Sequence, residues 1–439
     1  MAEGPQQQES SLRCPLPFGI FPPGHERHRQ RWPRTTRTGG QHARSREDIM
    51  IKTLLAGVAM ALALAEPAFS ETLKIGFMAS LTGPMGSISQ DARDGFLLAV
   101  EQRGGKLGGL QTEVIVEDDS LKPELAVGHA QKFVESDKVH FVVGMIASNI
   151  LQAVFHQIVE SETFMIGVNA GTSVYAGSKC SPFFFSTSSE NNQIPETMGK
   201  HAQDAGHKRI VMMVPNYQAG RDAVEGFRRH YRGEVLEEMF VTVGQLDFAS
   251  ELSRIRTLNP DALLVFMPGS MGVTLVRQFK QSGMAENLPF LSVWTVDETT
   301  LPATQQAAAG LYSASQWAPD LDVKANLEFV RLFKARYGHT PSAFAAQAYD
   351  AALLIDSAVA KAGLADKDRL RQALQAANFT STRGNFRYNT NHFPIQDYYL
   401  VQAEQSPDGS YTTAIKQKVF EDHADQKAPE CPMTAETKN

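Results

Sequence analysis

The chain has 439 residues, enough for two or three domains with a substantial buried core. Hydrophobic residues make up 42% and charged residues 21%, which excludes collagen-like, coiled-coil and wholly disordered chains. The net charge of −6 lacks the basic surplus of a nucleic-acid-binding protein, and the three cysteines form neither a CxxC pair nor a Cys/His cluster suited to zinc. We therefore expect no nucleic-acid partner, no metal and no cofactor.

The first 70 residues differ in composition from the rest of the chain. Residues 1–49 are rich in proline and arginine without apolar periodicity, which predicts a disordered extension. Residues 50–70 combine an early lysine, an apolar run at 54–65 and small residues at the exit, the pattern of a secretory signal peptide. The run is shorter than the roughly 20 residues that span a bilayer. We expect translation to start at Met50 and the exported chain at Glu71; the alternative is a translated basic extension.

Strand and helix patterns then alternate in two series. In the first, strands are expected at 73–79, 112–117, 139–144 and 164–168, and helices at 91–103, 123–136 and 150–160. In the second, strands are expected at 209–214, 235–243, 262–267 and 289–293, and helices at 220–230, 248–258 and 273–282. This alternation predicts right-handed βαβ units in parallel sheets, and therefore two α/β lobes.

The last part of the chain breaks the alternation. Three helices are expected at 325–337, 343–362 and 368–376, followed by strands at 384–388, 396–402 and 411–419. Motifs for catalysis are absent: the sequence has no HExxH and no GxSxG, and the glycine-rich stretch 104–109 joins a helix to a strand as a turn rather than a phosphate cradle. We expect a binding protein rather than an enzyme; an exported enzyme without a known motif is the alternative.

Several segments, taken together, resemble one family. They are IGFMASLTGPMGS (75–87), VVGMIASNILQAV (142–154), GVNAGTS (167–173), VPNYQAGRDAVEGFR (214–228) and NLEFVRLFKARYGHTPSAFAAQAYDAALLI (326–355). In this order they resemble the branched-chain amino-acid-binding (leucine-binding) family of ABC-transporter substrate-binding proteins, from about residue 73 to 419. The resemblance implies a type I periplasmic-binding-protein fold: two Rossmann-like lobes with parallel sheets, joined by a three-strand hinge, with the ligand in the cleft between them.

The resemblance also implies a domain division and partners. Lobe 1 would comprise 71–190 plus 318–380, lobe 2 would comprise 191–317 plus 381–419, and residues 420–439 would form a C-terminal tail. The protein would be a periplasmic monomer without membrane insertion, capturing a small carboxylate and delivering it to an inner-membrane ABC permease. A periplasmic ligand sensor with the same fold is the alternative.

The family's carboxylate-binding residues fall on two loops of lobe 1. Ser148, with Asn149 beside it at the start of a helix, matches a serine that binds the ligand carboxylate, where the helix N-terminus favours negative charge. The alternative is that Ser148 or Asn149 only caps the helix. Ala170 and Thr172 match a loop that adds a backbone and a hydroxyl contact, and a plain polar turn is the alternative.

The remaining matches form the cleft wall. Tyr217 matches a tyrosine on the lobe 2 face, and Ile88 and Phe344 are weaker matches to apolar positions. Trp294 and Trp317 are further candidates, although buried tryptophans more often serve as core packing.

The sequence offers few acidic residues that could pair with the ammonium group of an amino-acid ligand. Residues 266–272, where the family's amino-acid binders carry an acid, contain none. Glu190 lies near the family's other acidic position, with Asn191 as an alternative match. An aromatic or other apolar carboxylic acid therefore suits the sequence at least as well as a branched-chain amino acid.

Two cysteines remain once the predicted leader is removed. We expect Cys180 and Cys431 to form a disulfide, because an oxidising compartment preserves disulfides and no third thiol competes without Cys14. Two unrelated cysteines are the alternative.

Overall fold

The computed structural model describes residues 71–433, so the expected extension and signal peptide lie outside the described residues. The first sheet has six strands in the order β2-β3-β1-β4-β5-β6. Its strands are β1 (Leu73–Ala79), β2 (Lys106–Leu107), β3 (Leu110–Asp118), β4 (Phe141–Gly144), β5 (Phe164–Gly167) and β6 (Phe184–Ser186). All pairs are parallel except the short β2–β3 hairpin, as the βαβ pattern predicts.

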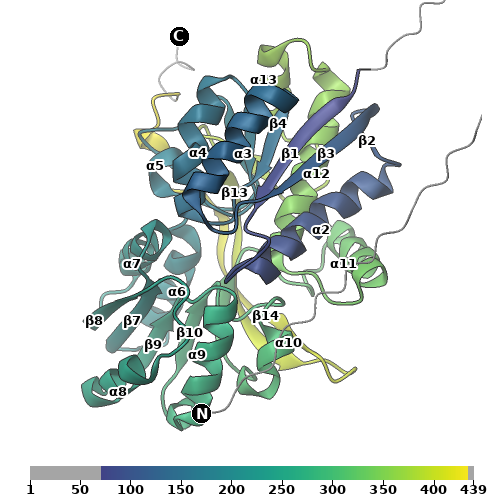
Figure 1. Cartoon of the computed structure of the whole chain (residues 1–439). Coiled ribbons are helices and arrows are strands. Elements are labelled where there is room, and N and C mark those ends of the chain that lie inside the picture. The colour runs from purple at the N-terminus through teal and green to yellow at the C-terminus, as the bar shows by residue number, and fades with distance from the viewer. Residues whose placement is uncertain (1–70, 434–439) are drawn as a thin grey trace, which may run out of the picture. The chain divides into compact units, whose positions relative to one another are not determined.

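The helices of this lobe come from two distant parts of the chain. The first group is α2 (Gly86–Gln102), α3 (Pro123–Gln131) continued by a π-helical turn, Lys132–Asp137, α4 (Ser148–Glu160) and α5 (Ser173–Ala176); the second is α11 (Lys324–Tyr337), α12 (Ala343–Ala362) and α13 (Lys367–Gln375). The purple-blue α2 lies against the green α12 in Figure 1. Gly95 allows this contact, because a Cβ there would lie 2.2 Å from the Ala345 carbonyl oxygen.

The second sheet has eight strands, in the order β12-β13-β11-β10-β9-β7-β8 with β14 added to β13. They are β7 (Arg209–Pro215), β8 (Glu234–Val241), β9 (Ala262–Val265), β10 (Phe290–Val293), β11 (Tyr312–Ser315), β12 (Arg387–Tyr388), β13 (Pro394–Gln405) and β14 (Tyr411–His423). The pairs from β8 to β11 are parallel, and the three C-terminal strands pair antiparallel. The helices are α6 (Gln193–Asp204), α7 (Gln218–His230), α8 (Ala249–Leu258), α9 (Ser270–Gln281) and α10 (Leu301–Thr304).

Helices cover both faces of this second sheet. Along β7, Met212 and Val214 belong to one hydrophobic cluster, while Val211 and Met213 belong to another. Successive strand residues point to opposite faces, so two clusters mean that both faces are buried. The near-continuous apolar run of β7 is therefore the sequence mark of a central parallel strand.

The chain passes between the two sheets three times: after β6, after β11 and after α13. At the third passage Arg383 forms a buried ion pair with Asp350 of α12, at 3.0 Å, and donates to Gln396 of β13 at 2.8 Å. Such a pair is costly to break once it is buried, because the surviving charge loses its partner. It ties the last connection to both lobes.

The C-terminal segment differs from the expected tail at 420–439. Strand β14 continues to His423, where the imidazole stacks on Phe420 at 4.4 Å and contacts Glu196 of α6 at 2.6 Å. The last described residues carry a disulfide between Cys180 and Cys431, the expected pair. The strand extends because these side chains find partners on lobe 2.

Candidate ligand-binding site

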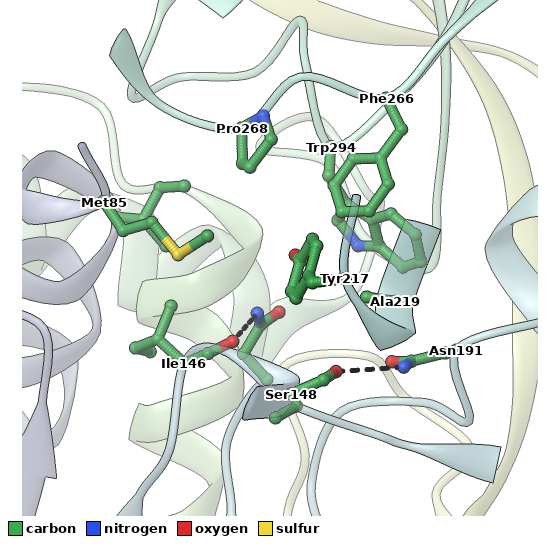
Figure 2. Close-up of a pocket in the computed structure, with 12 residues that line it drawn as sticks. Met85, Ile146, Ser148, Asn191, Tyr217, Ala219, Phe266, Pro268 and Trp294 are labelled. Carbon is green, nitrogen blue, oxygen red and sulfur yellow. Dashed lines mark hydrogen bonds between the residues drawn. The ribbon is translucent and has the colours of Figure 1, made fainter. Parts of the chain in front are cut away.

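A narrow pocket with about 20 Å³ of free space, partly open to solvent, lies where the two lobes meet (Figure 2). It lies beyond the carboxyl ends of β4, β5, β7, β9 and β10, the place where open parallel sheets bind ligands. Lobe 1 and the first passage line it with Met85, Ile88, Ile146, Ser148, Asn169, Ala170 and Asn191, and lobe 2 with Tyr217, Ala219, Phe266, Pro268 and Trp294.

Ser148 supplies a hydrogen-bond donor to this pocket. It is the first residue of α4, whose N-cap position is Ala147, so Ser148 does not serve as the N-cap residue. Its Oγ accepts from the Asn191 amide at 3.1 Å, which leaves the hydroxyl proton free to donate. The N–H groups of Ser148 and Asn149 have no acceptor among the described residues. Neutral donors at a helix N-terminus suit a carboxylate.

Asn191 links the two lobes behind this serine. The second hydrogen of its amide goes to Asp222 of α7 at 2.7 Å, and its Oδ1 accepts from the Gly171 N–H at 3.1 Å. A second side-chain amide, that of Asn169, is held by donating to the Ile146 carbonyl at 2.7 Å. The polar edge of the pocket is therefore fixed by hydrogen bonds before any ligand arrives.

Three aromatic rings from lobe 2 form the opposite wall. The Phe266 and Trp294 ring centroids are 4.9 Å apart, and those of Tyr217 and Phe266 are 6.1 Å apart. Burial raises the pKa of the Tyr217 hydroxyl, which keeps it neutral. Trp294 has φ +49°, a conformation that bulky residues rarely adopt and that tends to mark functional sites. The wall is apolar, flat-sided and uncharged.

The nearest acids lie behind the pocket wall rather than in it. Glu190 is fully buried and accepts from the Ser173 hydroxyl, and burial raises its pKa well above the ordinary value. Asp222 is 2% exposed, and burial raises its pKa as well. A raised pKa favours the neutral carboxyl, which is a poor partner for an ammonium group. No carboxylate is among the residues that line the pocket.

The structure gathers only part of the set expected from the sequence. Ile88, Ser148, Ala170 and Tyr217 line the pocket, whereas Asn149, Thr172, Glu190 and Phe344 do not. The Ala170 N–H already donates to the Met145 carbonyl at 3.0 Å, so it is not free for a ligand.

The four residues outside the pocket lining lie in different surroundings. Asn149 is half-buried on α4, and Thr172 and Glu190 are buried without reaching the pocket surface. Phe344 instead lines a second cavity, together with Trp294.

Several lining residues are not predicted as ligand contacts from the sequence. They are Met85, Ile146, Asn169, Ala219, Phe266 and Pro268, and Asn191 is predicted only as an alternative to Glu190. Their common signal is position: each follows a strand that ends at the cleft.

The two lobes also touch at the mouth of the pocket. The Ser270 N–H at the start of α9 donates to the Pro84 carbonyl of lobe 1 at 3.1 Å. Gly269 permits this approach, because its φ is +59° and a Cβ there would lie 2.2 Å from the Pro84 oxygen. The pocket is therefore bounded on both sides, as in a closed form of a two-lobed binder.

Comparisons with known proteins identify the class. The family described as periplasmic binding protein matches residues 72–409. The chain is 27% identical over 349 residues to the leucine-, isoleucine-, valine-, threonine-, and alanine-binding protein of Pseudomonas aeruginosa, with 77% of this chain and 91% of that protein covered.

Two solved structures of ABC-transporter solute-binding proteins are also similar. One, from R. palustris in complex with benzoate, has a TM-score of 0.78 and 28% identity, covering 82% of this chain and all of that chain. Another, from Rhodopseudomonas palustris in complex with 3,4-dihydroxybenzoic acid, has a TM-score of 0.75 and 27% identity, covering 80% and 98%.

The chain belongs to the periplasmic binding protein family, and the resemblance to the branched-chain amino-acid-binding group is confirmed. It is a substrate-binding protein of the ABC-transporter kind, with the type I two-lobed fold. Within residues 71–433 no helix is long and apolar enough to cross a membrane, and no cluster of His, Cys, Asp and Glu is arranged to hold a metal.

Proposed function

We propose that this protein captures a small aromatic carboxylic acid between its lobes and delivers it to an inner-membrane ABC permease. The observation that carries the proposal is the composition of the pocket wall: neutral donors around Ser148 face three aromatic rings, with no carboxylate among the lining residues. A carboxylate can be bound by such donors, and a ring can pack between aromatic faces. An amino acid would bring an ammonium group to a pocket whose lining has no carboxylate.

Support also comes from the relatives. The R. palustris protein was solved in complex with benzoate, and the match covers the whole length of that protein. The Pseudomonas aeruginosa relative is named for amino acids, and two buried acids lie close behind Asn191, so a branched-chain amino acid is the second candidate.

The cellular setting belongs to the same proposal. The protein acts as a monomer in the periplasm after cleavage of a signal peptide at residues 50–70, and it turns over no substrate. A sensor role with the same ligand would require a membrane receptor in place of the permease.

A thermal-shift screen separates the ligand classes. Ligand-free protein is heated with benzoate, hydroxybenzoates, leucine and isoleucine, each at matched concentration. A ligand at about 100 times its Kd adds roughly 2.7 kcal/mol of stability, a shift that is easily measured. We expect aromatic acids to raise the melting temperature and the amino acids to leave it unchanged; the reverse pattern would favour the second candidate.

A further inference from the structure

A second, narrow cavity, with about 30 Å³ of free space, adjoins the ligand pocket. Trp294 lines both, so it forms a shared wall. We call this space the hinge cavity; it is lined by Gln316, Trp317, Phe344, Gln347, Asp297 and Glu298, among other residues. Its walls come from both lobes and from the second passage between them.

Two side-chain amides in the hinge cavity have no partner. Gln316 is 2% exposed and Gln347 is fully buried, and among the described residues neither amide oxygen nor amide nitrogen makes a hydrogen bond. Buried polar groups in folded proteins are almost always hydrogen-bonded, because leaving them unpaired is costly. Two such amides facing one cavity indicate that something polar occupies it.

The charges around the cavity restrict that occupant. Asp297 and Glu298 are the acids in the wall, no basic side chain lines it, and the Asp297 Oδ2 is also buried without a partner. A second carboxylate on the ligand would therefore lie beside these two acids with no basic side chain to offset its charge. Burial raises the pKa of Glu298 to about 7, so a neutral hydroxyl is a better partner than a fixed charge.

We propose that the hinge cavity is a second subsite of the ligand pocket, taking a hydroxyl group carried at the far end of an aromatic monocarboxylate. The carboxylate lies at Ser148, the ring packs in the aromatic wall, and the hydroxyl reaches past Trp294 to Gln316 and Gln347. This inference rests on the proposed function, since it names the substrate class of the same site. Trp317 and Phe344 give the cavity aromatic faces that extend the apolar path.

The test uses pairs of acids that differ only in the hydroxyl. Benzoate, phenylacetate and 3-phenylpropanoate are compared by calorimetry with their 4-hydroxy derivatives. The three pairs differ in the distance between the carboxylate and the hydroxyl. One hydrogen bond to a neutral partner corresponds to about a three- to tenfold change in Kd. We expect at least one hydroxylated acid to bind at least fivefold more tightly than its parent, and terephthalate to bind more weakly than benzoate.

Variants then assign the gain to the cavity. Gln316→Leu and Gln347→Leu remove the amides at similar volume, and we expect each to return the ratio of the two affinities toward one. Gln375→Leu, at an exposed position on α13, is the matched control and keeps the wild-type ratio.

The outcomes separate the two proposals. If no aromatic acid binds, the proposed function fails. If the parent acids bind but no hydroxyl improves affinity, or if the gain survives both cavity variants, the subsite is overturned and the hinge cavity holds water only. The wild-type series decides the matter even where a variant does not fold.

Discussion

In the proposed site, Ser148 is the residue on which we expect ligand recognition to depend most. The Ser148 Oγ accepts a hydrogen bond from the Asn191 amide. The hydroxyl proton is therefore available to donate to a ligand carboxylate. Asn191 in turn spends both amide hydrogens, one on lobe 1 and one on lobe 2. The same side chain therefore orients the donor and joins the lobes that close around it.

We predict that Ser148→Ala weakens binding of an aromatic carboxylate about tenfold or more. A hydrogen bond to a charged group contributes about 1.5–3 kcal/mol, and the alanine also leaves an Asn191 hydrogen unpaired. Isothermal titration measures the change. Ser161→Ala, at the opposite end of α4, is the control. Equal affinities for wild type and Ser148→Ala would remove this serine from the site.

Glu298 makes the stability of the folded protein depend on pH, and its burial sets the sign of that dependence. Its pKa is raised to about 7 from the ordinary 4.5, so the folded protein holds the proton that the unfolded chain releases. Stability is therefore lost as pH rises from about 4.5 to 7, by at most roughly 3 kcal/mol, and the loss levels off above that.

We predict that Glu298→Gln removes this loss. The variant should gain stability relative to wild type between pH 5 and pH 8, as measured by urea unfolding at several pH values. Glu124→Gln, at an exposed position, should show no such trend. A stability difference that stays flat across this range would show that Glu298 is ionised in the folded protein.

At the scale of elements, buried hydrogen bonds and a disulfide hold the C-terminal segment against the rest of the molecule. Asp425 is 4% exposed and accepts from the Asn391 amide at 3.1 Å and from the Ala428 N–H at 2.9 Å. The disulfide between Cys180 and Cys431 then fixes this segment to lobe 1 across 251 positions of sequence. Cross-links over long loops restrict the unfolded chain most.

We predict that the mature, unfolded and unreduced protein contains no free thiol. Replacing both cysteines by alanine should lower the free energy of unfolding by about 2–5 kcal/mol, because the unfolded chain regains its freedom. Thiol titration and urea unfolding measure the two effects. Two titratable thiols per chain, or an unchanged free energy, would contradict the role given to the bridge.

How much of the fold could be predicted differs from element to element. The strand at 73–79 and the helix at 343–362 are confirmed to the residue, because long apolar patterns with clear ends define them. The sequence does not predict helix α6, because Pro195 and Gly199 interrupt its helical pattern, although packing buries both. It does not predict strand β11 either, because the segment YSAS is half polar.

The residues of the candidate site also divide into those that the sequence predicts and those that it does not. Residues in recognisable loops, such as Ser148 and Tyr217, could be placed from the sequence alone. Phe266 could not, and Trp294 is only a candidate, because a ring after a strand fits core packing equally well until the opposite lobe is in place. Phe344 is expected in the pocket but lies in the hinge cavity, which shares Trp294 with the pocket.

For the whole molecule, the proposed function requires export, because the protein would meet its permease only outside the cytoplasm. We predict that the periplasmic protein begins at Glu71. Removing residues 1–70, which hold nine Lys/Arg and six Asp/Glu, makes the net charge −9 in place of −6. Mass spectrometry of the periplasmic fraction measures the terminus. An intact Met1 or Met50 in that fraction would rule out this cleavage.

The central claim is that the pocket binds an aromatic carboxylate rather than an amino acid. Its most direct test is calorimetric titration of benzoate and of leucine into the same protein, unfolded and refolded beforehand to remove any co-purified ligand. We expect benzoate to bind at least 100-fold more tightly, about 2.7 kcal/mol, because only leucine brings an ammonium group, and no carboxylate lines the pocket. Leucine binding as tightly as benzoate, or more tightly, would contradict it.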